Sequence, residues 1–306
     1  MKLLLSHIAD MDGISPVILL KLLDLEFDYD LFEVGEVNDY LNNKLNDGSL
    51  DKYDEIYITD ISVNKEVADK INNSKYKDKF KLFDHHHSAM FLNEYDFATV
   101  MDTIDGIKVC GTTMFFNYLI DNYDNKVLTK NSVITYLELV RECDTWDFTE
   151  LKEEAMDLNT LLSFIGNEEF INNYTNFLTN NDEFYFTKEQ MNIIRHLNEQ
   201  KKEYLENVSK SVIIKNIRGY NVGVVFAESY RSELGHFIAD KYYNDIDLVA
   251  VINLNRYVSL RTVKNNIDVS KFASYYGGGG HKEASGMPFK EKVKELIISE
   301  IFDENR

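Results

Sequence analysis

Aspartate and histidine side chains recur at the ends of short apolar segments in the first half of this chain. The first segment runs into Ser6-His7-Ile8-Ala9-Asp10-Met11-Asp12-Gly13. Glu55–Thr59 ends in Asp60, Phe80–Phe83 ends in Asp84-His85-His86-His87, and Leu137–Cys143 ends in Asp144. Imidazole and carboxylate groups together suit Mn²⁺, Mg²⁺, Fe²⁺ or Zn²⁺, and the excess of oxygen favours Mn²⁺ or Mg²⁺.

Each of these side chains taken alone has an ordinary structural explanation. An aspartate just before a helix, such as Asp10, is more often an N-cap than a ligand. Asp60 and Asp144, each taken alone, would be turn or capping residues, and the three histidines would be part of a solvated loop. Recurrence at four successive elements favours a two-metal hydrolytic site, in which two cations share a bridging water. Alternation along an extended segment is expected to place Asp10 and Asp12 on one side.

The order of elements predicts an α/β protein with two domains. Residues 1–150 alternate apolar runs and helical stretches, which predicts a doubly wound, mostly parallel sheet. Residues 151–210 are expected to form a helical linker, and residues 211–306 a second, smaller α/β domain. The expected strands are Lys2–Ser6, Leu31–Val34, Glu55–Thr59, Phe80–Phe83, Ser211–Ile217, Tyr220–Ala227, Leu248–Leu254 and Tyr257–Thr262. The expected helices include Ser15–Leu25, Lys65–Asn72, Glu233–Tyr243, Val269–Tyr275 and Lys290–Phe302.

Charge is distributed unevenly along the chain. The net charge is −19, which argues against long nucleic acid as a partner, because such proteins normally carry a basic track. Residues 211–306 carry 13 basic and 12 acidic side chains, whereas residues 1–210 carry 20 and 40. An acidic domain can still bind phosphate if cations invert its local field. We therefore expect a phosphate-binding role for the near-neutral second domain.

Several classes of protein are excluded by short features of the sequence. No apolar run reaches the 18 residues that a membrane span needs, and the first residues are too short for a signal peptide. We therefore expect a cytoplasmic protein that does not bind membranes. Cys110 and Cys143 are too few for a disulfide framework and are expected to be buried thiols.

A run of four glycines in the second domain, Gly277-Gly278-Gly279-Gly280, precedes His281. Glycines let backbone N–H groups approach an anion, and this run is expected to lead into a helix N-terminus, a further anion-binding feature. Upstream, Arg261 ends a predicted strand and is suited to hold a phosphate or to stack on a base. Alone, the glycines would be a flexible loop and Arg261 a surface charge.

Together these motifs resemble the DHH phosphoesterase superfamily. The resemblance rests on Asp10-Met11-Asp12-Gly13, Thr59-Asp60, Asp84-His85-His86 and Glu142-Cys143-Asp144-Thr145-Trp146, in that order. It implies that one metal is held by His7, Asp10 and Asp60. The other would be held by Asp12, Asp60, His85 and Asp144, with Asp60 as the bridge. Asp84 and His86 would be catalytic, His86 as a hydrogen-bond donor or general acid, and His87 matches no family position.

The second domain is similar to the substrate-binding domain associated with this superfamily. Ser259-Leu260-Arg261, Asp268-Val269-Ser270 and the stretch from Gly278 to Gly286 carry this similarity, and Tyr230–His236 is similar to nano-RNase members. The resemblance implies that Arg261, Gly278, Gly279, Gly280 and His281 bind the non-scissile part of a substrate across an interdomain cleft.

The function expected from these features is hydrolysis of short oligonucleotides, such as nano-RNA and linear dinucleotides, to nucleoside monophosphates. Two divalent ions, Mn²⁺ before Mg²⁺, are the expected cofactors, and a homodimer is an open option. Alternatives within the class are a 3′-phosphoadenosine 5′-phosphate phosphatase, a cyclic (di)nucleotide phosphodiesterase and an exopolyphosphatase. A catalytically inactive nucleotide-binding sensor is the alternative from another class.

Overall fold

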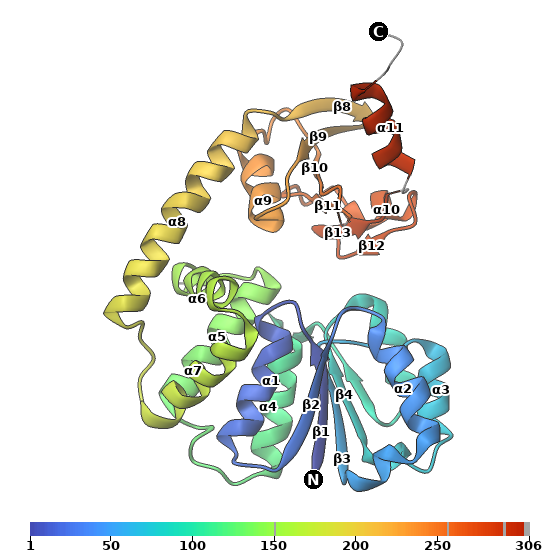
Figure 1. Cartoon of the computed structure of the whole chain (residues 1–306), viewed down its shortest axis with the longest axis vertical. Helices are drawn as coiled ribbons and strands as arrows, with labels where there is room; N and C mark the ends of the chain where they lie inside the picture. Colours follow the sequence, from blue (N-terminus) through green and yellow to red (C-terminus); the bar gives the residue numbers. More distant parts are fainter. Residues whose placement is uncertain (150, 256, 290–291, 303–306) are drawn as a thin grey trace. The chain divides into compact units, whose positions relative to one another are not determined.

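The chain forms two compact units, Met1–Arg195 and His196–Arg306. The computed structural model describes residues 1–149, 151–255, 257–289 and 292–302 (Figure 1). Helices α6 (Lys152–Ile165) and α7 (Asn167–Asn180), which the sequence assigned to a linker, bury side chains in the core of the first unit. The first unit therefore extends well beyond residue 150, and the change of unit falls within α8 (Lys188–Ser209).

A five-stranded sheet lies at the centre of the first unit, and all of its strands are parallel. The strand order is β2-β1-β3-β4-β5, so β1, β3 and β4 are neighbours in space. This arrangement confirms the predicted parallel sheet. The strands are β1 (Lys2–His7), β2 (Phe27–Phe32), β3 (Glu55–Thr59), β4 (Phe80–Asp84) and β5 (Ala98–Val100). The helices are α1 (Met11–Leu22), α2 (Glu36–Asp47), α3 (Lys65–Asn72), α4 (Gly111–Asn122) and α5 (Asn131–Thr145) together with α6 and α7.

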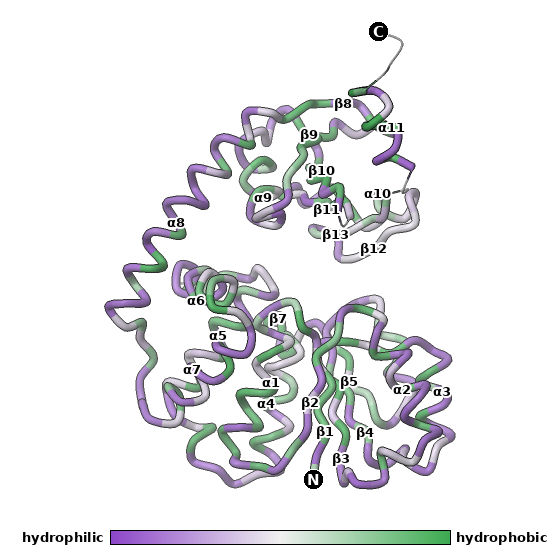
Figure 2. The backbone as a smooth tube through the Cα atoms, in the orientation of Figure 1, coloured by the Kyte–Doolittle hydropathy of each residue, from purple (hydrophilic) through white to green (hydrophobic). Residues whose placement is uncertain are grey.

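Alternate side chains of these strands enter two separate cores, because successive side chains of a strand point to opposite faces. Leu4, Tyr57 and Phe83 pack with α1, α4 and α5 on one face. Leu3 and Ile58 pack with α2 and α3 on the other. Figure 2 shows hydrophobic residues concentrated in β1, α1 and α4, with hydrophilic residues prevailing along α8. Because helices cover both faces of the sheet, a ligand site is expected at the carboxyl ends of its strands.

Some predicted elements of the first unit had the wrong bounds or type. Strand β2 starts at Phe27, not Leu31, because an edge strand tolerates the exposed Asp28 and Asp30, which a pattern search takes for a loop. Helix α1 starts at Met11, so Asp12 lies in its first turn and not in an extended segment. The prediction that alternation aligns Asp10 with Asp12 was therefore wrong. Leu137–Cys143 is part of α5.

The second unit is built on a six-stranded mixed sheet of order β12-β13-β11-β10-β9-β8. Only β9 and β10 pair in parallel; the other pairs of this sheet, within the described residues, are antiparallel. One face packs against α10 and the other against α9 and the end of α8. The strands are β8 (Ile213–Ile217), β9 (Tyr220–Phe226), β10 (Leu248–Ile252), β11 (Val258–Arg261), β12 (Gly279–Gly280) and β13 (Ala284–Met287). The helices are α9 (Arg231–Lys241), α10 (Val269–Ser274) and α11 (Lys292–Ile301).

The glycine run lies in a hairpin and not before a helix. Gly279 and Gly280 form β12, which pairs with Gly286 and Ser285 of β13. The predicted helix N-terminus after the glycines was therefore wrong: the run is preceded by the C-terminal end of α10 and continues into β13. A small two-stranded hairpin, β6 (Thr103–Ile104) with β7 (Ile107–Lys108), completes the strands of the first unit. Among the described residues, none of the helices has the length and apolar character to span a bilayer.

Candidate metal centre

Three of the predicted site residues lie at the carboxyl ends of neighbouring strands of the first sheet. His7 is the last residue of β1, Asp60 follows β3 and Asp84 ends β4. Asp60 has a left-handed backbone conformation, with φ 54°, which is uncommon outside glycine and often marks a functional position. Its backbone N–H donates to the carbonyl of Phe83 in the neighbouring strand, at 3.0 Å. The turn after β3 is thereby fixed against β4.

The two carboxylate oxygens of Asp60 face different groups of side chains. Oδ2 lies 3.4 Å from Nδ1 of His7, which in turn is 3.5 Å from Oδ2 of Asp10. Oδ1 lies 3.5 Å from Nε2 of His85. His85 Nε2 is also 3.3 Å from Asp144 Oδ2 and 3.8 Å from Asp12 Oδ2. The structure thus brings all six predicted ligands together in two groups, and Asp60 touches both.

Asp10 combines the two roles that the sequence presented as alternatives. Its Oδ1 accepts a hydrogen bond from the backbone N–H of Gly13 at 3.0 Å, so Asp10 is the N-cap of α1. Its Oδ2 remains directed to His7. Capping fixes the orientation of the carboxylate, and one oxygen is still available to a cation.

Asp12 is held by the N-terminus of α4, a contact that the sequence analysis missed. Its Oδ2 accepts from Gly111 N–H and its Oδ1 from Thr112 N–H, both at 2.7 Å. The Thr112 hydroxyl donates to the Asp12 carbonyl at 2.7 Å. Helix N-termini favour carboxylates in this position. Gly111 and Thr112 directly before an apolar helical run form a helix-start signal that could have located this contact.

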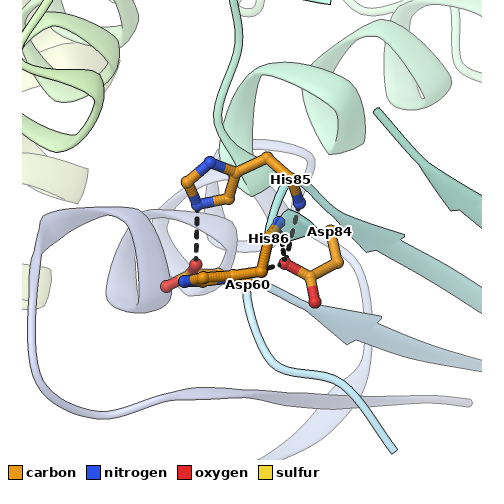
Figure 3. A group of neighbouring side chains, drawn as sticks. All are labelled: Asp60, Asp84, His85 and His86. Carbon is orange, nitrogen blue, oxygen red and sulfur yellow. Dashed lines mark hydrogen bonds and ion pairs between the residues drawn. The ribbon is translucent and has the colours of Figure 1, made fainter. Parts of the chain in front are cut away.

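Asp84 accepts hydrogen bonds on both of its oxygens. Its Oδ1 receives the backbone N–H groups of His85 at 2.7 Å and His86 at 3.2 Å, and lies 2.7 Å from His86 Nδ1 (Figure 3). Its Oδ2 accepts from the hydroxyl of Ser62. Burial acts to raise the pKa of this carboxyl, but hydrogen bonds with His86 and Ser62 lower the pKa to about 2. Asp84 therefore stays charged and fixes the orientation of the His86 ring. Ser62 carried no signal in the sequence.

Together, burial and neighbouring charges leave the pKa values of Asp60, Asp144 and His7 raised. Burial raises the pKa of Asp60 well above its usual range, and the charges of Asp12 and Asp10 raise it further. Burial likewise raises the pKa of Asp144 to about 7, although His85 opposes the change. Burial disfavours charged His7, yet the neighbouring carboxylates of Asp10 and Asp60 raise its pKa to about 10. The cluster is therefore an electrostatically unfavourable concentration of acids that cations would relieve.

The residues present fit divalent cations. Within the described part of the chain, Asp60 Oδ2 and Asp144 Oδ2 are buried without a hydrogen-bond partner, which a bound ion commonly accounts for. His7, Asp10 and Asp60 form one group whose ligand atoms lie close enough to share an ion, and Asp12, His85 and Asp144 form another. Carboxylate and imidazole without thiolate is a donor set for hard or borderline divalent metals.

The remaining histidine and cysteine predictions concern residues beside these groups. His87 is exposed and is the first residue of a 3₁₀ helix, His87–Glu94. Cys110 is fully buried beside α4, whereas Cys143 is only partly buried, so the expectation of buried thiols is met fully by Cys110 alone.

The substrate-binding candidates of the second unit lie at one end of its sheet. Arg261 ends β11 and pairs with Ala284 of β13, next to the register pair of Gly280 and Ser285. A Cβ on Gly278 would collide with the carbonyl of Gly286, and one on Gly280 would lie 2.8 Å from the carbonyl of Ala284. These two glycines are therefore required by the hairpin itself. Gly279 has no described atom within 4 Å of a Cβ position. His281 is exposed, and its N–H donates to the Ala284 carbonyl at 2.7 Å.

Comparison with known proteins decides the family. A search of family models finds no match. The chain is, however, 33% identical over 309 residues to oligoribonuclease NrnB of Bacillus subtilis (strain 168), across 98% of this chain and 75% of the relative. The chain belongs to the NrnB family of DHH phosphoesterases. As a member of this family it is a hydrolase that acts on phosphoester bonds, which confirms the predicted superfamily and the predicted enzyme class.

Two solved structures show that other proteins share this fold. The pGpG-specific phosphodiesterase PggH of Vibrio cholerae superposes with a TM-score of 0.53 at 14% identity, over 99% of this chain and 98% of that one. RecJ of Thermus thermophilus, solved with Mn²⁺, gives a TM-score of 0.55 at 12% identity, over 98% of this chain and 51% of that one. At these identities the likeness shows the fold, and the predicted fold class is confirmed.

Proposed function

We propose that this NrnB-family hydrolase cleaves short oligonucleotides to nucleoside monophosphates with two divalent cations, Mn²⁺ before Mg²⁺. The relative with 33% identity is named for oligoribonuclease activity. The net charge of −19 and the acidic first 210 residues disfavour a long polyanion, whose binding normally needs a basic surface. A few nucleotides are therefore the substrate length that best fits the family and the charge.

The observation that carries the proposal is the position of Asp60 between two groups of ligands. One oxygen faces His7 and the other faces His85, at 3.4 and 3.5 Å. A carboxylate shared in this way is what a pair of cations requires. We assign one cation to His7, Asp10 and Asp60, and the other to Asp12, Asp60, His85 and Asp144. Bound cations would supply a water of lowered pKa and neutralise the phosphoryl oxygens.

The residues around the cluster fix the orientation of the groups that meet the substrate. Asp84 accepts hydrogen bonds from Nδ1 of His86 and from the backbone N–H groups of His85 and His86, so the His86 imidazole and the backbone of this segment are restrained. With Nδ1 engaged, His86 offers Nε2 to the phosphate as a hydrogen-bond donor or general acid. We assign Asp84 the positioning role and His86 the catalytic one. Asp12 is restrained in the same manner by Gly111 and Thr112.

The second unit is assigned the part of the substrate away from the scissile bond. Arg261, the glycines of β12 and His281 lie at one end of its sheet. Arginine donors and a hairpin backbone free of Cβ atoms are suited to phosphate. Gly279 is the position of the run where this role can be tested without disturbing the hairpin.

The test is a substrate panel with the purified full chain and Mn²⁺. We expect pApA to release AMP, detected by chromatography, and Asp60→Asn to abolish the release. The panel includes 3′-phosphoadenosine 5′-phosphate, cyclic di-AMP and polyphosphate. Turnover of one of these in the absence of AMP release from pApA would replace the proposal with the corresponding alternative. His87→Gln, at an exposed neighbour of the catalytic histidine, is the matched control and should keep full activity.

A further inference from the structure

A surface arginine of the second unit lies over two exposed tyrosine rings. The Cζ atom of Arg218 is 4.5 Å from the ring centroid of Tyr275 and 5.5 Å from that of Tyr276. The two tyrosines follow the end of α10, whereas Arg218 lies in the turn between β8 and β9. Tyr275 is 58% exposed and Tyr276 is 40% exposed. Three planar groups from two distant segments therefore form one surface, which we call the stacking platform.

The turn that carries Arg218 has a backbone that does not favour arginine. Arg218 and Gly219 have left-handed φ values of 54° and 88°, and Ile217 pairs with Tyr220 in the flanking strands. Turns of this kind favour asparagine or aspartate before the glycine, because most residues with a Cβ are strained in the left-handed region. A large cationic side chain is thus held where a small polar one would close the turn more easily. This indicates that the guanidinium has a role beyond the turn itself.

The Arg218 guanidinium has no carboxylate partner. Among the described residues, none of the acidic side chains forms an ion pair with it, whereas Arg141 in the first unit lies near Glu138, Glu142 and Asp147. A guanidinium over aromatic rings keeps a flat outer face that can stack on a further planar group. Its charge also remains available to an anion. A ligand that is both planar and anionic therefore complements the platform.

The Tyr276 ring of the platform is anchored in the core of the second unit. Its centroid lies 5.4 Å from that of Phe272, which is 2% exposed, and Phe272 meets the Tyr220 ring edge-on at 5.6 Å. Because Tyr220 is the first residue after the turn of Arg218, these rings connect the turn to the end of α10. A platform that is ordered before the ligand arrives loses little conformational entropy on binding.

The platform adjoins the glycine run that is assigned to the substrate. Tyr276 precedes Gly279 by three residues, so their Cα atoms are at most about 11 Å apart. The N–H of Gly278 donates to the Ala273 carbonyl at 3.0 Å, which holds the run against the end of α10. A stacked strand advances about 3.4 Å per nucleotide, so this distance corresponds to up to about three nucleotides. The platform is thus placed to meet a base of a substrate longer than a dinucleotide.

We propose that Arg218, Tyr275 and Tyr276 form a subsite on which a nucleobase of an oligonucleotide longer than a dinucleotide stacks. Aromatic rings and arginine accept any base, because every base has a π-face. The arginine charge also suits the phosphates on either side of that base. The subsite tightens the binding of the longer members of the substrate class without selecting a sequence. This inference rests on the proposed function and extends it from the scissile bond to the length of the substrate.

The experiment measures how turnover depends on substrate length. Values of kcat/KM are compared for pApA and pApApApApA with the full chain and Mn²⁺. The wild type is expected to prefer the pentanucleotide, and Arg218→Gln and Tyr275→Ala each to lose about tenfold of that preference. Tyr275→Phe, which keeps the ring, should retain it. Tyr243→Ala is the matched control and should also retain it, since Tyr243 is an exposed tyrosine of the same unit with Lys264 Nζ 5.4 Å from its ring centroid.

Binding in EDTA separates this inference from the proposed function. With the divalent cations removed, three compounds are titrated against the full chain by calorimetry: pApA, pApApApApA, and pApA extended by three abasic nucleotides. Tighter binding of the pentanucleotide than of the other two by the wild type, lost in Arg218→Gln and in Tyr275→Ala, supports the platform even if no hydrolysis is seen. A pentanucleotide that binds the wild type no more tightly than pApA or the abasic compound, or a preference that survives in either variant, would overturn it.

Discussion

Gly111 lies against the backbone of Asp60: a Cβ on Gly111 would be 2.8 Å from the Asp60 amide nitrogen and 3.0 Å from its Cα. The same glycine donates its N–H to Asp12. The first residue of α4 thus restrains both Asp60, which faces the two groups of side chains, and Asp12, which belongs to one of them. Because the atoms that a Cβ would meet are backbone, they cannot be displaced by a simple side-chain rotation.

Gly111→Ala is therefore expected to weaken metal binding through these two aspartates. Partners that orient metal ligands typically contribute about 10- to 100-fold in affinity or activity, and we expect a loss in this range. Titration of the metal-free protein with Mn²⁺, followed by calorimetry, measures it. Thr113→Ala, two residues further along the same helix, is the control, and equal affinities of Gly111→Ala and wild type would refute the role.

His86 and His87 are adjacent histidines with different environments. His86 Nδ1 is 2.7 Å from Asp84 Oδ1, whereas His87 is exposed at the start of a short turn. His86→Gln is expected to reduce kcat on pApA about 10²- to 10⁴-fold with little change in KM, the range for loss of a general acid. His87→Gln should match the wild type. A similar loss in both variants would show that the segment matters only for folding.

The sequence was sufficient to predict the parallel sheet from its local pattern, and the family resemblance identified the six candidate ligands that the structure brings together. Apolar runs define the strands, and His7 and Asp60 stand where two of these runs end, whereas Asp12 and Asp144 lie in helices. The contacts that restrain these candidate ligands could not be predicted. Gly111 and Thr112 reach Asp12 from about a hundred positions away, and Ser62 reaches Asp84 through a turn. The hairpin at Gly279 was missed because it depends on pairing with β13, which a glycine run does not reveal.

The carboxyl of Asp60 is expected to destabilise the folded state of the metal-free protein. Burial and the charges of Asp12 and Asp10 raise its pKa well above the usual range. A carboxyl whose pKa is raised by folding destabilises the folded state at any pH above its ordinary pKa, because the unfolded chain holds the charge more easily. At pH 7.5 in EDTA, Asp60→Asn should therefore unfold at a higher temperature than the wild type.

Adding Mn²⁺ should give the wild type a higher unfolding temperature than Asp60→Asn, the reverse of the order in EDTA. A cation that binds only the folded state at about 100 times its dissociation constant stabilises it by roughly 2.7 kcal/mol. The wild type should gain this stabilisation, while Asp60→Asn should gain little. Differential scanning calorimetry with and without Mn²⁺ measures both effects, and an Asp60→Asn variant that is less stable in EDTA would contradict the electrostatic account.

A substitution at Gly279 can distinguish a structural role of the glycine run from a role in substrate binding. No described atom lies within 4 Å of a Cβ at this position, and its φ is not in the left-handed region, unlike that of Gly280 at 138°. Gly279→Ala should therefore leave the unfolding temperature unchanged, while raising KM for pApA about tenfold if a phosphate approaches the backbone there. Gly280→Ala should instead destabilise the second unit. An unchanged KM in Gly279→Ala would remove this residue from the binding site.

The N-cap carboxyl of Asp268 makes the stability of α10 depend on pH. Hydrogen bonds from Ser270, whose N–H lies at 3.0 Å, and from Lys271 lower the pKa of this N-cap carboxyl. A lowered pKa means that the charged form stabilises the folded state; the contribution is complete above the usual carboxyl pKa, near 4, and disappears as the pH falls below it. Asp268→Ala should cost about 1 kcal/mol at pH 7. Hydrogen exchange of the α10 amides, in a series from pH 7 to pH 3, should show the difference from wild type shrinking at the acid end.

Asp245→Asn, at an exposed aspartate of the same unit, is the control and should show no difference from wild type at any pH. If Asp268→Ala is less stable than wild type by the same amount across the whole series, its effect comes from packing and not from charge.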